Sequence, residues 1–485
     1  MNRLLSGGSA LILLWLCMHT VALPQSSASR AEEERAMEVL DAFAAGDLDA
    51  LLASMNEHWV PADDPQERAD RWQRAVPTML NEFGDGVVVS VLIQQEHVIE
   101  FVTERPGGPT LAYTFEFETD PPHRILRMNV DFHEGRGGPE LPRLEIPIGM
   151  RAEQIEDVVD PWVRQLADDG AFSGVLMIAV DGKPVYSVAV GKASIEWDVP
   201  NRLDTRFDLG SINKSFTQVA LAQLAVEGKL SFDDHIIDHL PDYPNADAAR
   251  QITIRHLIEQ TSGLGDIFTD EFFQSSRALY RTPRDFFPLF ADKPLARKPG
   301  EKREYSNAGY MVLGAIIAEA SGMPYEDYVK EHIFKPAGMT GAGFFAHDEP
   351  VPNVAVGYTR MGPDGELRNN LFMLPIKGNS AGSAQASAED LLKFDNALRE
   401  HVLLPPAWTA WYFGGPEPDT ANQRFDDVSR STAETGIAGG APGVSAVMEG
   451  NGRLTVIVLS NFDPPTAEDM GRELYQKLNR VVRDN

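Results

Sequence analysis

Two residues with complementary chemistry stand three positions apart at the start of an expected helix, Ser211 and Lys214. A serine hydroxyl becomes a nucleophile when a neighbouring base takes its proton, and a lysine acts as that base only where its surroundings keep it neutral. Residues three apart on a helix share a face, and a helix N-terminus favours developing negative charge. The pair therefore predicts a serine nucleophile, Ser211, with Lys214 as its activating base.

Because a serine and a lysine at this spacing recur by chance, the interpretation depends on a second motif. Tyr305-Ser306-Asn307 stands directly before a helical run rich in small residues, Met311 to Ala320. A phenol can relay protons, and an amide can hydrogen-bond both a lysine and a substrate carbonyl. We therefore predict that Tyr305 shares the proton transfers with Lys214 and that Asn307 binds the substrate.

With these motifs the chain resembles the serine β-lactamase family, especially the class C enzymes, their esterase relatives and the D,D-peptidases. Further segments that carry the resemblance follow in the expected order: Ile254 to Leu257, Thr261 to Leu264, Lys298 to Gly300, Ala388 to Leu398 and Gly439 to Gly443. The resemblance implies an α+β fold, in which an antiparallel sheet is flanked by helices and joined to an all-helical subdomain. It also implies an acyl-enzyme mechanism that needs no metal and no cofactor.

The resemblance assigns a role to each matching position. Ser211 matches the acylated serine, Lys214 the motif lysine, Tyr305 the tyrosine that exchanges protons with the serine and the leaving group, and Asn307 the asparagine that positions the substrate. The family's oxyanion hole uses two backbone N–H groups, one from the serine and one from a neighbouring strand. Gly440 or a close neighbour matches the second.

A third family motif, Lys-Thr-Gly or a histidine variant, is changed here, because Ile437 occupies the cationic position. The change removes an attraction for the carboxylate of penicillins and D-alanyl peptides, whereas neutral esters or amides suffer less. Lys298, Arg303 or Lys377 could supply a charge from a loop. We expect an esterase-like serine hydrolase of ester or amide bonds. The alternatives are a β-lactamase or a D-alanyl peptidase or D-aminopeptidase and, in another class, a non-catalytic member that binds a ligand or partner.

Two other motifs suggest different chemistry. Gly378 to Gly382 matches the G-x-S-x-G elbow of α/β-hydrolases around Ser380, but the next helix begins only after Ser387, whose Ser-Ala-Glu-Asp sequence is a typical capping box. His235 and His239 are four apart, as in some zinc sites, but no glutamate follows the first histidine as in H-E-x-x-H. We interpret the first segment as a loop near the site and the histidines as a solvated surface.

The amino-acid composition limits the classes of binding partner and the cellular compartment of the protein. The chain of 485 residues has 43 basic and 72 acidic residues and a formal net charge of −29, which disfavours nucleic-acid binding. A basic start, a short apolar run and small residues near Ala22 and Ala28 predict a signal peptide, with an uncleaved anchor as the alternative. The single cysteine, Cys17, lies in this segment. We therefore expect an exported, periplasmic or secreted protein without disulfides that acts on small-molecule ester, amide or peptide substrates.

The predicted organisation has four parts: a signal peptide over residues 1–28, a small α+β domain over 29–133, a linker over 134–150 rich in glycine and proline, and the hydrolase domain over 151–485. In the small domain, helical patterns come first and four runs of strand-forming residues follow. This order resembles the cone-like fold of the ketosteroid-isomerase and nuclear-transport-factor class.

Overall fold

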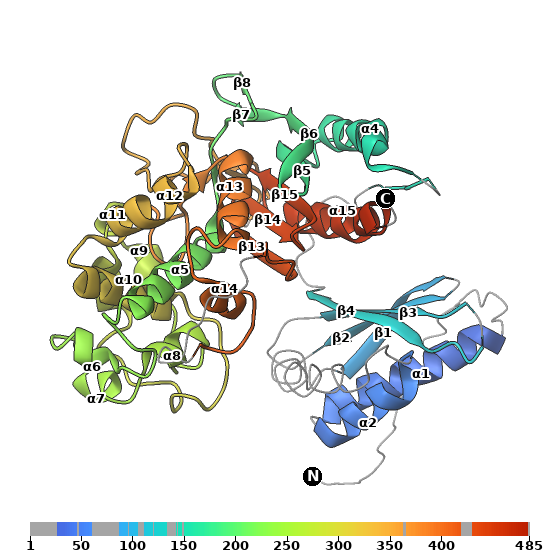
Figure 1. The fold of residues 1–485 in the computed structure, drawn as a ribbon, viewed down its shortest axis with the longest axis horizontal. Helices are drawn as coiled ribbons and strands as arrows, with labels where there is room; N and C mark the ends of the chain where they lie inside the picture. The colour runs from blue at the N-terminus through green and yellow to red at the C-terminus, as the bar shows by residue number, and fades with distance from the viewer. Residues whose placement is uncertain are drawn as a thin grey trace, which may run out of the picture. The chain divides into compact units, whose positions relative to one another are not determined.

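The computed structural model describes residues 27–483 apart from 46–47, 61–86, 96, 105–110, 120, 133–141, 143, 148–149, 362–364 and 419–428. The chain divides into two compact units, residues 1–134 and 135–485 (Figure 1). The predicted signal peptide over residues 1–28 lies almost wholly outside the described residues, and so does most of the predicted linker. The described helices include none that is long and apolar enough to cross a membrane.

The described residues of the first unit form two helices and a four-stranded antiparallel sheet with strand order β1-β2-β3-β4. Its elements are α1 (Ser27–Ala45), α2 (Leu48–His58), β1 (Val87–Gln95), β2 (Val98–Glu104), β3 (Leu111–Phe117) and β4 (Ile125–Phe132). Apolar residues of α1 such as Val39 and Phe43 share one core with Phe101 and Phe115 of the sheet. Helices precede strands, as the sequence predicts, whereas a further helix predicted near Arg68 to Phe83 lies outside the described residues. The cone-like class stays a prediction.

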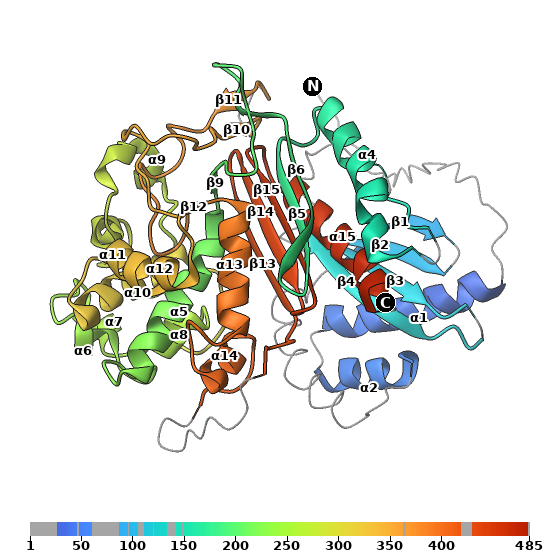
Figure 2. The ribbon, with the colours of Figure 1, turned by 45° about the horizontal axis from the view of Figure 1, so that its top comes forward.

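The second unit is built on a five-stranded antiparallel sheet with strand order β13-β14-β15-β5-β6 (Figure 2). The strands are β5 (Gly174–Val180), β6 (Lys183–Val190), β13 (Thr435–Ala441), β14 (Val444–Gly450) and β15 (Leu454–Ser460). The hairpin between β5 and β6 turns at Asp181 and Gly182, both with positive φ, as the Asp-Gly pair predicts. Strands from the two ends of the unit thus lie side by side.

Successive side chains of the central strands point to opposite faces of the sheet, and each face packs into its own hydrophobic core. Ile457 and Leu459 of β15 face the helical subdomain, whereas Val456 and Val458 face a second cluster. Helices α4 (Ile155–Asp168) and α15 (Thr466–Arg483) cover that second face. Leu144, in the predicted linker, is buried in the same cluster, and its backbone N–H donates to Glu473 at 3.0 Å. The sheet is therefore covered on both faces, as its apolar strands require.

The helical subdomain is inserted between β6 and β13. Its helices are α5 (Asn213–Val226), α6 (Ile236–His239), α7 (Ala246–Ala249), α8 (Ile254–Ile258), α9 (Asp270–Gln274), α10 (Asn307–Ser321), α11 (Tyr325–Val329), α12 (Lys335–Ala337), α13 (Ala388–Arg399) and α14 (Pro406–Tyr412). The 3-10 helices of this segment are η2 (Gly210–Ile212), η3 (Arg277–Leu279) and η4 (Pro283–Leu289), and η5 (Lys330–Phe334) is a π-helical turn; another 3-10 turn, η1 (Ala152–Gln154), precedes α4. Short strands are β7 (Lys192–Ser194), β8 (Val199–Pro200), β9 (Phe207–Asp208), β10 (Tyr358–Thr359), β11 (Arg368–Asn369) and β12 (Gln385–Ala386).

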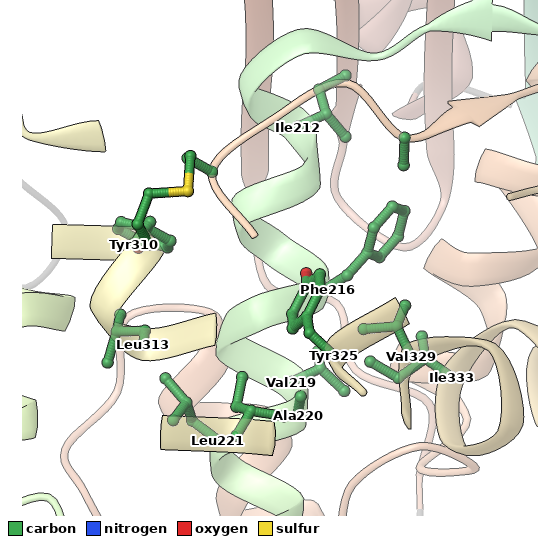
Figure 3. Close-up of a cluster of buried hydrophobic side chains, with 14 of the residues drawn as sticks. Ile212, Phe216, Val219, Ala220, Leu221, Tyr310, Leu313, Tyr325, Val329 and Ile333 are labelled. Atoms are coloured by element: carbon green, nitrogen blue, oxygen red, sulfur yellow. The ribbon is translucent and has the colours of Figure 1, made fainter. Parts of the chain in front are cut away.

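Helix α5 is the centre of this subdomain. Phe216 and Val219 are fully buried, and Figure 3 shows them among side chains of the neighbouring helices α10 and α11. The Phe216 ring makes edge contacts with Phe334 and Phe394, at centroid distances of 5.0 and 4.8 Å. A helix packed on several sides has little freedom to move. The first turn of α5, which carries Lys214, is therefore held firmly.

Candidate active site

Ser211 lies on η2, a single 3-10 turn that leads directly into α5. The carboxylate of Asp208 accepts a hydrogen bond from the backbone N–H of Gly210 at 2.8 Å. Gly210 has φ +49°, and a Cβ there would lie 2.8 Å from the carbonyl carbon of Gly439 and 2.9 Å from the nitrogen of Gly440. Only glycine combines this conformation with so close a backbone neighbour.

The close approach is also seen from Gly439, on the edge strand β13 that faces the Ser211 turn. A Cβ added at Gly439 would lie 2.0 Å from the carbonyl oxygen of Leu209 and 2.6 Å from the backbone nitrogen of Ser211. The sequence prediction places a second oxyanion donor at Gly440 or a close neighbour, and the structure brings this segment to the backbone of the serine. Two N–H groups beside a serine hydroxyl are the components of an oxyanion hole.

Lys214 is buried, with 8% of its surface exposed, and three oxygen atoms surround its Nζ. They are Ser211 Oγ at 3.0 Å, Asn307 Oδ1 at 2.8 Å and the carbonyl oxygen of Ala381 at 2.7 Å. The ring of Tyr305 lies 4.7 Å from Nζ. The structure thus places the predicted base within hydrogen-bonding distance of the predicted nucleophile.

Burial lowers the pKa of Lys214 from its ordinary value to about 7, and the negative charge of Asp266 opposes this shift. Desolvation disfavours the charged ammonium and so favours the neutral amine. Near neutral pH a large share of the molecules therefore has an unprotonated Lys214. Such an amine can accept the proton of Ser211.

Tyr305 stands directly before α10, and its hydroxyl lies 2.5 Å from Ser211 Oγ. Its side chain is 55% exposed overall, but the hydroxyl points into the site. Desolvation of this hydroxyl raises the pKa of Tyr305, and the contact with Ser211 opposes the rise in part. The phenol therefore stays protonated at neutral pH. It is suited to donate a proton or relay one, which leaves Lys214 as the better base.

Asn307 begins α10, whose N-cap is Ser306; the Ser306 hydroxyl accepts from the N–H of Gly309 at 3.1 Å. The side-chain amide of Asn307 donates from Nδ2 to both oxygens of Asp266, at 3.1 and 3.3 Å. Its Oδ1 accepts from Lys214. Because a carboxylate only accepts hydrogen bonds, Asp266 holds the Nδ2 end of the amide, and Oδ1 is left facing Lys214.

The sequence resembles the Beta-lactamase family over residues 159–479, more than half of the chain. The chain belongs to this family. It is 32% identical over 310 residues to the penicillin-binding protein PbpX of Bacillus subtilis (strain 168), across 64% of this chain and 76% of that protein. Among solved structures, it resembles a penicillin-binding protein from Bacillus halodurans, with 29% identity, a TM-score of 0.56 and coverage of 66% of this chain and 98% of that one.

The hydrolase EstCE1, described as having promiscuous acyltransferase activity, shares the fold at 22% identity and a TM-score of 0.54, over 68% of this chain and 99% of that chain. These likenesses confirm the predicted α+β fold, with its antiparallel sheet, flanking helices and helical subdomain. They also confirm the predicted family, that of the serine β-lactamases and penicillin-binding proteins. Members of the Beta-lactamase family with this fold are serine hydrolases.

Asp266 and Ala381 complete the site, and sequence reasoning missed both. Asp266 follows the Thr261 to Leu264 segment by two residues and also accepts from the backbone N–H of Asn307 at 2.9 Å. Its position so soon after a family segment was a usable signal. The contribution of Ala381 is a backbone carbonyl, which no side-chain pattern reveals.

The Gly378 to Gly382 segment contacts the site, and its serine is buried. Ser380 is fully buried, and its Oγ faces the sulfur of Met311 at 3.9 Å. The carbonyl of Asn379 accepts from the side-chain amide of Asn213 at 2.6 Å, which ties the segment to α5. The loop interpretation therefore agrees with the structure. The capping box at Ser387 is also present at the start of α13.

Ile437 stands on β13 two residues before Gly439 and is partly buried against the larger core. Lys377 forms an ion pair with Glu326 at 3.0 Å. Lys298 lines a separate hollow with Asn245 and Asp247. Burial raises the pKa of Tyr310, and the positive charge of Arg303 opposes this rise. The ring of Tyr310 lies 5.3 Å from Lys214 Nζ. Lys377 and Lys298 therefore have neighbours other than Ser211, Lys214, Tyr305 and Asn307.

His235 and His239 have other roles. The Nε2 of His239 lies 2.9 Å from a carboxylate oxygen of Asp234. His235 is the N-cap of α6, and its backbone N–H donates to Asp238 at 2.8 Å. Among the described residues, the one group of three histidine or acidic side chains spaced to hold a metal lies elsewhere, in the first unit.

The Lys214 environment leads to a prediction about pH. Because only neutral Lys214 accepts a proton, kcat/KM is expected to rise about tenfold per pH unit below an inflection near 7 and to level off above it. Asp266 raises the pKa of Lys214, so Asp266→Asn is expected to move the inflection to lower pH. Ester hydrolysis measured from pH 5 to 9 checks both. An inflection unchanged in this variant would show that Asp266 has no electrostatic effect on the base.

Proposed function

We propose that the second unit hydrolyses ester or neutral amide bonds through a covalent acyl-enzyme on Ser211. The observation that carries the proposal is one connected network: Lys214 Nζ contacts Ser211 Oγ and Asn307, and the Tyr305 hydroxyl contacts Ser211 Oγ from another direction. A nucleophile within reach of a base whose pKa burial lowers to about 7 is the arrangement that nucleophilic catalysis requires.

In the proposed reaction, neutral Lys214 takes the proton of Ser211 while Oγ attacks the substrate carbonyl carbon. The resulting oxyanion accepts hydrogen bonds from backbone N–H groups of Ser211 and the Gly440 segment. The bond to the leaving group then breaks as Tyr305 donates its proton to it and regains one from Lys214. Water attacks the acyl-enzyme by the same proton route, which releases the acid and restores Ser211.

Ile437 supports the choice of substrate class. In its place the family resemblance expects a cation that holds a substrate carboxylate, and an isoleucine offers only apolar contact. An uncharged ester or amide loses nothing by this change, whereas a substrate carboxylate would lie unpaired in the site. The likeness to penicillin-binding proteins favours a second candidate, the hydrolysis of β-lactams or D-alanyl peptides.

The test is a substrate panel with the purified chain: a short-chain nitrophenyl ester, a D-amino-acid amide, a D-alanyl dipeptide and a chromogenic cephalosporin. We expect the ester to give the highest kcat/KM. A fluorophosphonate probe should label Ser211, as peptide mass spectrometry would show. If the chain hydrolyses none of these compounds and the probe leaves Ser211 unmodified, the proposal is wrong and the non-catalytic binding alternative stands.

A substitution at Ile437 tests the specificity argument. Ile437→Lys restores a cation, so kcat/KM for a carboxylate-bearing substrate is expected to rise about fivefold relative to that for a neutral ester, the value of one partly exposed ion pair of about 1 kcal/mol. Ile437→Met is the control, because it keeps an apolar side chain of similar size. Equal changes for charged and neutral substrates would contradict the assignment of this position.

A further inference from the structure

Three side chains from separate elements of the first unit converge at one end of its sheet. Glu32 lies on α1, His97 in the turn between β1 and β2, and His123 in the turn between β3 and β4. Glu32 is buried, with 1% of its surface exposed, while the two imidazole side chains are 19% and 12% exposed. The imidazole rings are stacked, with centroids 5.6 Å apart and planes inclined by 16°.

Each histidine occupies an unusual backbone position. His97 has φ +64° and His123 has φ +55°, in the left-handed region where side chains other than those of asparagine, aspartate and histidine are rare. Few residue types other than histidine, asparagine and aspartate would therefore fit these two turn positions. The two rings approach the same carboxylate, that of Glu32, from two separate hairpin turns.

The distances suit coordination of a single ion. Glu32 Oε1 lies 2.7 Å from His97 Nδ1 and 3.7 Å from His123 Nδ1, and the candidate ligand atoms of the three residues all lie within 4.8 Å of one another. Zinc binds imidazole nitrogen and carboxylate oxygen at about 2.0–2.2 Å, so tetrahedral ligand atoms lie about 3.3 Å apart. The ligand atoms would have to move by up to about 1.5 Å relative to one another to produce that geometry, a range that side-chain rotations cover.

We propose that Glu32, His97 and His123 bind one Zn²⁺ ion, with a fourth position left for water or another small ligand. Two imidazoles and one carboxylate form a donor set for a transition metal, whereas Ca²⁺ and Mg²⁺ prefer oxygen ligands alone. The bound ion would compensate the charge of the buried Glu32 and join α1 to both hairpins. The first unit would then be a metal-binding module.

A simple hydrogen-bonded pair explains less of the arrangement. His97 alone would satisfy Glu32 Oε1, since its Nδ1 lies at hydrogen-bonding distance. His123 does not need the carboxylate, because its Nδ1 lies 3.0 Å from the carbonyl oxygen of Glu118 and can donate there. Coordination through this nitrogen replaces that hydrogen bond, and the ring proton moves to Nε2. Zinc binding is therefore expected to displace the contact between His123 and Glu118, which a hydrogen-bonded pair retains.

The experiment titrates Zn²⁺ into the untagged full-length chain after dialysis against a chelator, by calorimetry. We expect one ion per chain and a Kd in the micromolar range or below. His97→Asn and His123→Asn remove each imidazole but keep a residue that tolerates positive φ. Each is expected to weaken binding at least about 100-fold, by analogy with the loss of a metal-site partner. Glu32→Gln is expected to do the same.

Two matched controls remove histidines that pair with acidic groups elsewhere: His58→Asn, whose ring contacts Glu38 in the same unit, and His239→Asn, whose ring contacts Asp234 in the second unit. Both are expected to bind Zn²⁺ like the wild type. Far-UV circular dichroism checks that each variant folds. X-ray absorption at the zinc edge of the wild type provides a measurement that needs no variant and should show two imidazole ligands.

A wild-type chain that binds no Zn²⁺ would overturn the proposal. So would unchanged binding in His97→Asn and His123→Asn, or an absorption spectrum without imidazole ligands. None of these results depends on ester hydrolysis by the second unit.

Discussion

Ser211→Ala is expected to lower kcat/KM for a nitrophenyl ester by at least about 1000-fold, because the variant lacks the atom that forms the acyl-enzyme. The residual rate would come from the remaining donors around the site. Ser211 is only partly buried, on a turn whose shape is determined by Gly210 and Gly439. The smaller side chain should therefore leave the fold intact, with the free energy of unfolding changed by less than about 1 kcal/mol.

The measurement is steady-state hydrolysis together with fluorophosphonate labelling and thermal unfolding. Ser380→Ala is the matched control, since Ser380 belongs to the other serine motif and is fully buried. It should retain labelling at Ser211. Activity that survives in Ser211→Ala and disappears in Ser380→Ala would reverse the assignment of the nucleophile.

Lys214→Met should be almost as damaging, with a loss of about 100- to 10,000-fold in kcat/KM, the range for removing a general base. Methionine fills much of the same space without a basic nitrogen. It leaves Asn307 Oδ1 and the Ala381 carbonyl without their shared donor. Part of the loss in kcat/KM will therefore come from these lost hydrogen bonds. A second substitution is needed to separate that effect from the loss of the base.

Lys214→Arg provides that comparison. Arginine keeps the positive charge and the donors but cannot lose its proton in a protein, so it cannot act as a base. We expect this variant to be as inactive as Lys214→Met. If it retained most of the activity at pH 7, Lys214 would act as a fixed charge, and the inflection near pH 7 would belong to another group.

The parts of the site that the sequence predicted are those encoded locally. Ser211 and Lys214 are related by helical spacing, and Asn307 begins a helix whose start the sequence indicates. The strands of both units were likewise predictable, because alternation and turn residues are local signals. The contact of Lys214 with Ala381, in contrast, joins residues 167 positions apart through a backbone carbonyl. Nothing in the composition of either segment specifies that contact.

The contacts that the sequence did not predict are therefore tertiary contacts between distant segments. Asp266 illustrates it, because an aspartate in a glycine-containing loop is usually a turn residue, and here it also turns the amide of Asn307 toward Lys214. The cluster of Glu32, His97 and His123 went unnoticed for the same reason. Its members are far apart in the chain, and only the pairing of four strands brings the two hairpin turns together.

The strand order of the second unit also determines when this site can form during synthesis. β15, close to the end of the unit, lies between β14 and β5 and is the partner that joins the early hairpin to the late one. Until the ribosome has released residues 454–460, the early hairpin lacks its inner neighbour, and β13 has no completed sheet from which to reach the Ser211 turn. Contacts between such distant segments form slowly. A nascent chain would consequently carry Ser211 and Lys214 without the assembled pocket until β15 has left the ribosome.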